Sequence, residues 1–120
     1  MDLLSDKSLT TREYIEDVHL FKSGDEAKEA FLIYSGEVRV YKKEDNVEHE
    51  IAVLEPGDIV GEMALIQGIK HKSNAVAKEK SVVVIITKDV LQTKLDEADP
   101  LLKSLIHMLV KRLYSTNEKI

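Results

Sequence analysis

Residues 57–77, GDIVGEMALIQGIKHKSNAVA, combine a glycine turn, a short helix-forming run and a cluster of basic side chains. Gly61 and Glu62 can form a tight turn, and Met63 and Ala64 favour a helix after it. The first turn of a helix leaves backbone N–H groups free, and such groups bind phosphate. Glu62 would repel a phosphate, so its carboxylate is expected to accept a hydrogen bond from a sugar hydroxyl. These residue types therefore predict a site for a nucleotide phosphodiester.

Three basic side chains follow this run, at Lys70, His71 and Lys72. A lysine can neutralise a phosphate as a point charge, whereas a histidine can do so only when it is protonated. Ser73 could donate one further hydrogen bond from its hydroxyl group. The plainer interpretation is a solvated basic loop in front of an ordinary strand, and the residue types alone leave both interpretations open.

Turn signals indicate the framework that positions this segment, because they recur roughly every eight to twelve residues, as in all-β sandwiches and barrels. The turns are expected at 24–25, 35–36, 45–46, 56–58 and 68. Between them the pattern predicts strands at 14–21, 30–34, 37–43, 48–54, 74–78 and 81–87. Val38 and Val40 fall on one face of their strand and Arg39 and Tyr41 on the other, so one side of the sheet should be wet.

The spacing of apolar residues changes to three and four near residue 88, which predicts helices between about residues 89 and 116. Asp99 is expected to be an N-cap followed by Pro100 at the first helical position, so the helix should break there and start again. The apolar stripe of the second helix is expected either to pack on its own domain or to form the seam of a weak homodimer.

The composition describes one small domain, expected to span residues 1–120, with 43% apolar and 32% charged residues and no cysteine. The net charge of −5 argues against a DNA-binding surface, which needs a concentrated basic face. No apolar run approaches the roughly 18 residues that span a bilayer, and the N-terminus lacks the features of a secretory signal. The expected location is therefore cytoplasmic, without membrane contact.

The sequence contains neither of two motifs that would indicate an enzyme. A cupin-type metal site needs two histidines that flank one strand residue, and the four histidines form no such pair: His19, His49, His71 and His107. Serine hydrolase chemistry needs a Gly-x-Ser-x-Gly turn, which is also missing. The chain is expected to be neither an enzyme nor a metal protein, and to hold no cofactor.

The segment around Gly61 resembles the phosphate-binding cassette of the cyclic nucleotide-binding domains, as in catabolite activator proteins and protein kinase A regulatory subunits. Residues 20–45, 51–65 and 81–113 resemble the family's strands, turns and closing helices, so the likeness covers about residues 10–115. The resemblance implies a mainly β fold with flanking helices. It implies a double-stranded β-helix, or jelly-roll barrel, at about 12–88, a short cassette helix, and C-terminal helices at about 89–116.

The resemblance also implies cAMP or cGMP as the ligand. The ribose would contact Glu62, and the phosphate would contact the N–H groups near Met63 and Ala64. Asn74 stands near a position where the family often has a small hydroxyl residue that touches the base or phosphate. The family usually has an arginine nine residues after the glutamate. This chain has His71 at that spacing, and Lys72 would take the place if one residue were inserted.

The replacement of the family's arginine by His71 or Lys72 leaves two functional hypotheses. The first is a cyclic nucleotide sensor that signals through movement of its C-terminal helices to an effector outside this chain. The second is a degenerate domain that binds no nucleotide and acts as a protein-interaction module, because it lacks the arginine fork that holds the phosphate.

Overall fold

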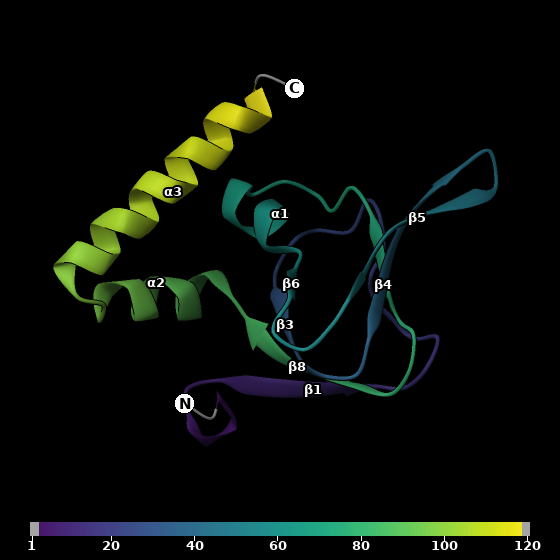
Figure 1. Ribbon diagram of the computed structural model, residues 1–120, viewed down its shortest axis with the longest axis horizontal. Coiled ribbons are helices and arrows are strands. Elements are labelled where there is room, and N and C mark those ends of the chain that lie inside the picture. Colours follow the sequence, from purple (N-terminus) through teal and green to yellow (C-terminus); the bar gives the residue numbers. More distant parts are fainter. Residues whose placement is uncertain (1–2, 119–120) are drawn as a thin grey trace. The chain divides into compact units, whose positions relative to one another are not determined.

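The computed structural model describes residues 3–118, apart from the side chains at 113, 114 and 116–118 (Figure 1). After a short 3₁₀ turn at Leu3–Ser5, the described strands are β1 (Thr10–Tyr14), β2 (His19–Phe21), β3 (Ala30–Ser35), β4 (Val38–Glu44), β5 (Val47–Leu54), β6 (Ile59–Val60), β7 (Asn74–Ala77) and β8 (Ser81–Ile86). The α-helices are α1 (Glu62–Gln67), α2 (Lys88–Asp96) and α3 (Pro100–Glu118).

The strands form two antiparallel sheets in the orders β1-β8-β3-β6 and β2-β7-β4-β5. Consecutive strands thus alternate between the sheets at several points, which is the connectivity of a jelly roll. The prediction of a mainly β, jelly-roll fold with a short cassette helix and C-terminal helices is confirmed.

The predicted strand at 14–21 is wrong, because the structure divides it between the two sheets. β1 pairs with β8 and β2 pairs with β7. Asp17, between them, has a left-handed φ of 68°, and its N–H donates to the carbonyl of Ala77. The first half of β1 is exposed and β6 has only two residues, so neither produced an apolar pattern that could be read from the sequence.

The core lies between the inner faces of the two sheets. It contains Tyr14, Leu20, Phe21, Phe31, Ile33, Val38, Val40, Val60, Ala75, Ala77, Val83 and Ile85. Val38 and Val40 therefore point inward, as their spacing predicted. Tyr41 was expected on a wet face but is only 7% exposed, because the Arg39 guanidinium lies 4.3 Å from its ring centroid and His19 contacts its hydroxyl group.

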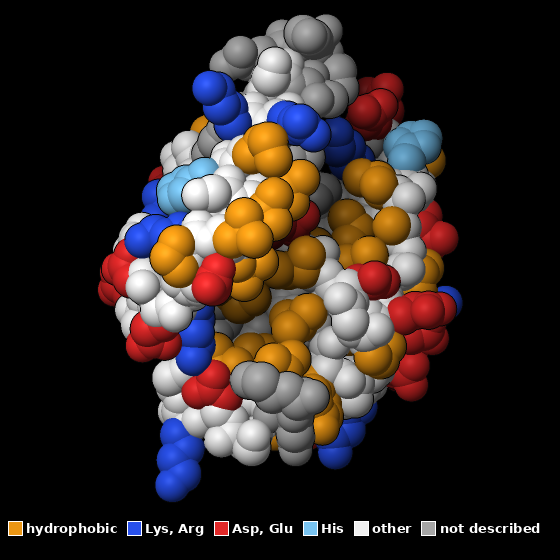
Figure 2. All heavy atoms as spheres, turned by 60° about the vertical axis from the view of Figure 1, so that its left-hand side comes forward, with side chains coloured by type: hydrophobic (Ala, Val, Ile, Leu, Met, Phe, Trp, Pro, Cys, Tyr) orange, Lys and Arg blue, Asp and Glu red, His pale blue; other side chains and the backbone are white. Residues whose placement is uncertain are grey.

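The chain divides into two compact units at the junction of Lys88 and Asp89. In the second unit, the Leu101 N–H donates to Asp99 Oδ1 at 2.9 Å and α3 begins at Pro100, so the predicted break and N-cap are confirmed. α3 carries exposed apolar side chains, shown in orange in Figure 2: Leu101, Leu102, Leu105, Met108 and Leu109. Among residues 3–118, none of the helices has both the length and the apolar content needed to cross a bilayer.

Candidate functional site

The cassette begins with a left-handed glycine. Gly61 has φ 83° and ψ 0°, a conformation that side chains disfavour, and it stands at the N-cap of α1. The helix closes at Gly68, which has φ 67° and donates its N–H to the carbonyl of Ala64. Ala64 and Leu65 are buried and anchor the helix on the first unit. The sequence therefore folds here into a single helical turn and a half between two glycines.

Glu62 and Met63 are the first residues of this helix, and both are partly exposed. The Glu62 carboxylate forms no hydrogen bond or ion pair with any residue in the part of the chain that the structure describes. It is therefore free to accept a hydrogen bond from a ligand.

His71 is buried, with 5% of its surface exposed. Its ring stacks on Phe21, with centroids 3.7 Å apart and an interplanar angle of 10°. A Cβ added to Gly61 would lie 3.1 Å from His71 Cε1, so the two ends of the cassette touch. The His71 N–H donates to the Asp25 carbonyl at 3.0 Å, and its own carbonyl accepts from the Gly24 N–H at 2.8 Å. These bonds fasten the loop to the β2–β3 turn.

Burial lowers the pKa of His71 below its usual 6.5, and the nearby Asp25 carboxylate opposes this shift without reversing it. The imidazole is therefore neutral at pH 7. A neutral imidazole offers one N–H donor at most and no positive charge, so His71 cannot clamp a phosphate in the way of an arginine.

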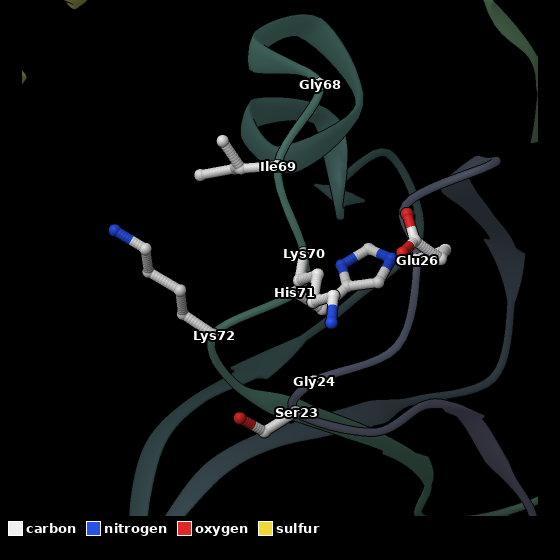
Figure 3. A pocket seen from close by; sticks show the side chains of 8 residues that line it. All are labelled: Ser23, Gly24, Glu26, Gly68, Ile69, Lys70, His71 and Lys72. Atoms are coloured by element: carbon white, nitrogen blue, oxygen red, sulfur yellow. The ribbon is translucent and has the colours of Figure 1, made fainter.

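Lys70 and Lys72 lie on the exposed side of the same loop. With His71 they border an open pocket of about 760 Å³, whose other lining residues are Ser23, Gly24, Glu26, Gly68 and Ile69. Figure 3 shows the Lys72 side chain extending away from the His71 ring. The two side chains predicted to supply the phosphate's cation, His71 and Lys72, therefore point in different directions.

Asn74 differs from the other predicted ligand residues because both ends of its amide are already bonded. Its Oδ1 accepts from the Ser23 N–H at 3.0 Å, and its Nδ2 donates to the Tyr41 carbonyl at 3.3 Å. The side chain therefore joins three neighbouring strand segments. Ser73 is partly exposed, and its hydroxyl forms no hydrogen bond within residues 3–118.

Sequence reasoning missed Phe21 and the Gly24–Asp25 turn as the surroundings of His71. The sequence gives no spacing signal for them, since the pairing of β2 with β7 creates the contact. In the described part of the chain, no group of three or more histidine, aspartate or glutamate side chains could hold a metal ion.

Comparison with known proteins identifies the family. The model of the cyclic nucleotide-binding domain matches residues 11–98. Among curated relatives, the anaerobic regulatory protein of Haemophilus influenzae is 30% identical over 102 residues, which are 84% of this chain and 39% of that protein. The cAMP-dependent protein kinase regulatory subunit of Pyricularia oryzae is 24% identical over 96 residues, 80% of this chain and 24% of that protein. The chain thus spans less than half the length of these relatives.

Solved structures agree with this assignment. The half-site-occupied form of the EAL enzyme Bd1971 has a TM-score of 0.87 and 30% identity, covering 91% of this chain and 98% of that one. The cAMP-bound form of Bd1971 has a TM-score of 0.70 and 30% identity, and the match covers 91% of this chain and 30% of that one. The catabolite activator protein of Thermus thermophilus shares the fold, with a TM-score of 0.77 and 24% identity. That match covers 97% of this chain and 55% of that one. This chain belongs to the cyclic nucleotide-binding domain family.

Proposed function

We propose that this chain is a sensory domain that binds cAMP or cGMP at the cassette formed by α1 and residues 68–74. The observation that supports it best is the contact between the two ends of the cassette, the Gly61 turn and the His71 ring nine residues after Glu62. Membership of the family also supports it. So does the similarity to Bd1971, which has been solved in a cAMP-bound form at 30% identity and in a cGMP-bound form at 29% identity.

Each predicted residue has a distinct task in this proposal. Glu62, whose carboxylate is free, accepts a hydrogen bond from a ribose hydroxyl. The N–H groups of Met63 and Ala64, after the Gly61 turn, face the cyclic phosphate. The positive charge comes from His71 once it is protonated, or from Lys72 after a rearrangement of its exposed side chain.

Two polar residues at the end of the cassette complete the proposed contacts. Ser73 has an uncommitted hydroxyl that can donate to the phosphate. Asn74 contributes only if it gives up one of its two internal hydrogen bonds.

A second function, a protein-interaction module without nucleotide, is favoured by the state of His71. The ring is buried, stacked and neutral at pH 7, so the phosphate meets no fixed cation where the family has an arginine. A charge-assisted hydrogen bond contributes about 1.5 to 3 kcal/mol, so losing one weakens binding by about 10- to 150-fold.

The output of either function would pass through α2 and α3 to an effector outside this chain. The exposed leucines of α3 supply an apolar surface for such a partner or for a weak homodimer. A ligand moves these helices only as far as it binds one of their arrangements more tightly than the other.

Calorimetric titration with cAMP and cGMP at pH 6 and pH 8 tests the proposal. We expect dissociation constants of about 1 μM or tighter at pH 6 and weaker binding at pH 8, because protonation of His71 supplies the missing charge. His71→Arg should tighten binding at both pH values. A gain from Lys72→Arg instead would assign the phosphate to Lys72. No heat at millimolar nucleotide would favour the interaction module.

A further inference from the structure

A second hollow, of about 520 Å³, lies beside β2, β4 and β7, and it shares Lys72 and Asn74 with the proposed nucleotide cassette. Four lysines border it, Lys22, Lys42, Lys43 and Lys72, and His19 and Tyr41 form part of its floor. We call it the lysine groove. Glu62, Met63 and His71 do not line it, so its remaining residues define a second candidate site.

The sheet topology brings these lysines together. Lys22 follows β2, and Lys72 stands two residues before β7. Tyr41 is the last residue of β4 that pairs with β7, so Lys42 and Lys43 lie on the β4–β5 hairpin that continues beyond the other strands (Figure 1). The groove therefore lies between this hairpin and the ends of β2 and β7.

The ammonium groups around the groove lack internal partners. None of the four forms an ion pair with another residue in the described range 3–118, whereas Arg12, Arg39, Lys80 and Lys103 are each paired with a carboxylate. One carboxylate, Glu44, lines the groove. A local positive charge in a chain of net charge −5 attracts an anionic partner through the potential that it creates.

The floor of the groove is polar but neutral. His19 Nε2 and the Tyr41 hydroxyl lie 2.7 Å apart, and the two rings meet edge to face. Burial lowers the pKa of His19, and the charge of Lys22 lowers it further, so the imidazole carries no charge at pH 7. An incoming segment would thus meet cations at the rim and an aromatic surface beneath them.

The surrounding charges restrict the kind of anion that fits. Asp45, Glu48 and Glu50 are exposed on the same hairpin, where Glu48 pairs with Lys43 and Glu50 with Tyr41 in the strand register. A long nucleic acid or a lipid surface would run against these carboxylates. Lysines, moreover, provide mobile point charges without the planar fork that selects phosphate. We propose that the lysine groove docks a short acidic segment of a partner protein.

A fluorescein-labelled hexaglutamate peptide, followed by fluorescence anisotropy with the full chain, tests this docking. The variant Lys22→Gln/Lys43→Gln removes two groove charges without touching the proposed nucleotide cassette. It should weaken peptide binding by about 2- to 30-fold, and the effect should shrink at high salt. The control Lys28→Gln/Lys78→Gln removes two exposed lysines outside the groove and should leave the affinity within about twofold.

The other outcomes decide against the proposal. Equal losses in both double variants would mean that the peptide senses only net charge. Binding of tripolyphosphate or of phosphatidylserine vesicles in place of the peptide would assign the groove to phosphate or to lipid. Amide shifts in the unmodified chain provide a check that needs no variant: peptide should perturb residues 19–23 and 41–44, and shifts confined elsewhere would overturn the assignment. The peptide results do not depend on the proposed nucleotide binding, because they are expected even if the chain binds no cAMP.

Discussion

The packing of His71 and its proposed contact with a phosphate favour opposite protonation states of the ring. Its stack on Phe21 and its contact with Gly61 need a ring without charge, since burial disfavours the imidazolium. A phosphate beside it would favour the protonated form instead. An anion bound here would therefore raise the pKa of His71 from its lowered value and draw a proton from the solvent. Ligand binding and proton uptake are expected to occur together at this residue.

The same residue makes the stability of the barrel depend on pH. The pKa of His71 is lower in the folded chain than the 6.5 of an exposed histidine, so the folded state binds fewer protons below that pH. The contribution of His71 to stability is therefore fully present above about pH 6.5, and it is lost as the pH falls towards the pKa of the folded state. We expect His71→Phe, which keeps a ring against Phe21, to lose less stability between pH 7 and pH 5 than the unmodified chain. Urea unfolding measures this, with His49→Phe on an exposed strand residue as the control.

Glu62 gives the second prediction at this scale. Its carboxylate has no partner among residues 3–118, so Glu62→Ala should leave the fold intact while removing a ribose contact. The affinity for cAMP or cGMP should fall by about 1 to 3 kcal/mol, the cost of leaving a buried polar group unsatisfied. Calorimetry should compare Glu62→Ala with the control Glu16→Ala, which removes an exposed carboxylate between β1 and β2. Equal affinity for both variants would exclude Glu62 as the ribose ligand.

Among the elements, the turn between β3 and β4 has the least room for change. Gly36 has φ 93°, and an added Cβ would lie 2.6 Å from the Lys80 carbonyl oxygen and 2.7 Å from Ser81 Cα. Ser81 is fully buried, and its hydroxyl donates to the carbonyls of Glu37 and Glu79. This arrangement holds the start of β8 against the start of β4.

Gly36→Ala should therefore cost more than a glycine replacement elsewhere. We expect a loss of about 2 to 4 kcal/mol, against about 1 to 2 kcal/mol for Gly57→Ala, where φ is 97° but nothing lies within 4 Å of the added atom. Urea denaturation of both variants separates the backbone strain that they share from the collision that only Gly36 suffers. Similar losses would mean that the β3–β4 turn moves aside at little cost.

The predictability of the elements follows from the strength of their turn signals. Glycines mark the turns before β4 and β6 and both ends of α1, and the strands predicted from residue 30 onward lie within a residue or two of the observed ones. The division of 14–21 into β1 and β2 depends on Asp17, whose left-handed conformation gives no such signal. For the site, the sequence predicted the Gly61 turn and the helix after it. It could not predict the neutral, stacked state of His71, because Phe21 reaches it only through the pairing of β2 with β7.

At the scale of the whole chain, the core belongs to one unit. Every residue of the core cluster lies between Tyr14 and Ile85, and α2 has no buried residue. A fragment of residues 1–88 should therefore fold without the C-terminal helices. Circular dichroism should record one cooperative thermal transition with a β-rich spectrum. A gradual transition without cooperativity would show that the barrel needs residues 89–120.

The pairing of Tyr41 with His19 also gives this protein an intrinsic spectroscopic probe. The chain has no tryptophan and four tyrosines, so ultraviolet emission comes from very few groups. The Tyr41 ring is held under Arg39, and its hydroxyl is bonded to His19 on the floor of the lysine groove. Anything that separates this pair changes the ultraviolet absorption and fluorescence of Tyr41. A partner that displaces His19 from Tyr41 can therefore be detected from the tyrosine signal, with no dye attached to the protein.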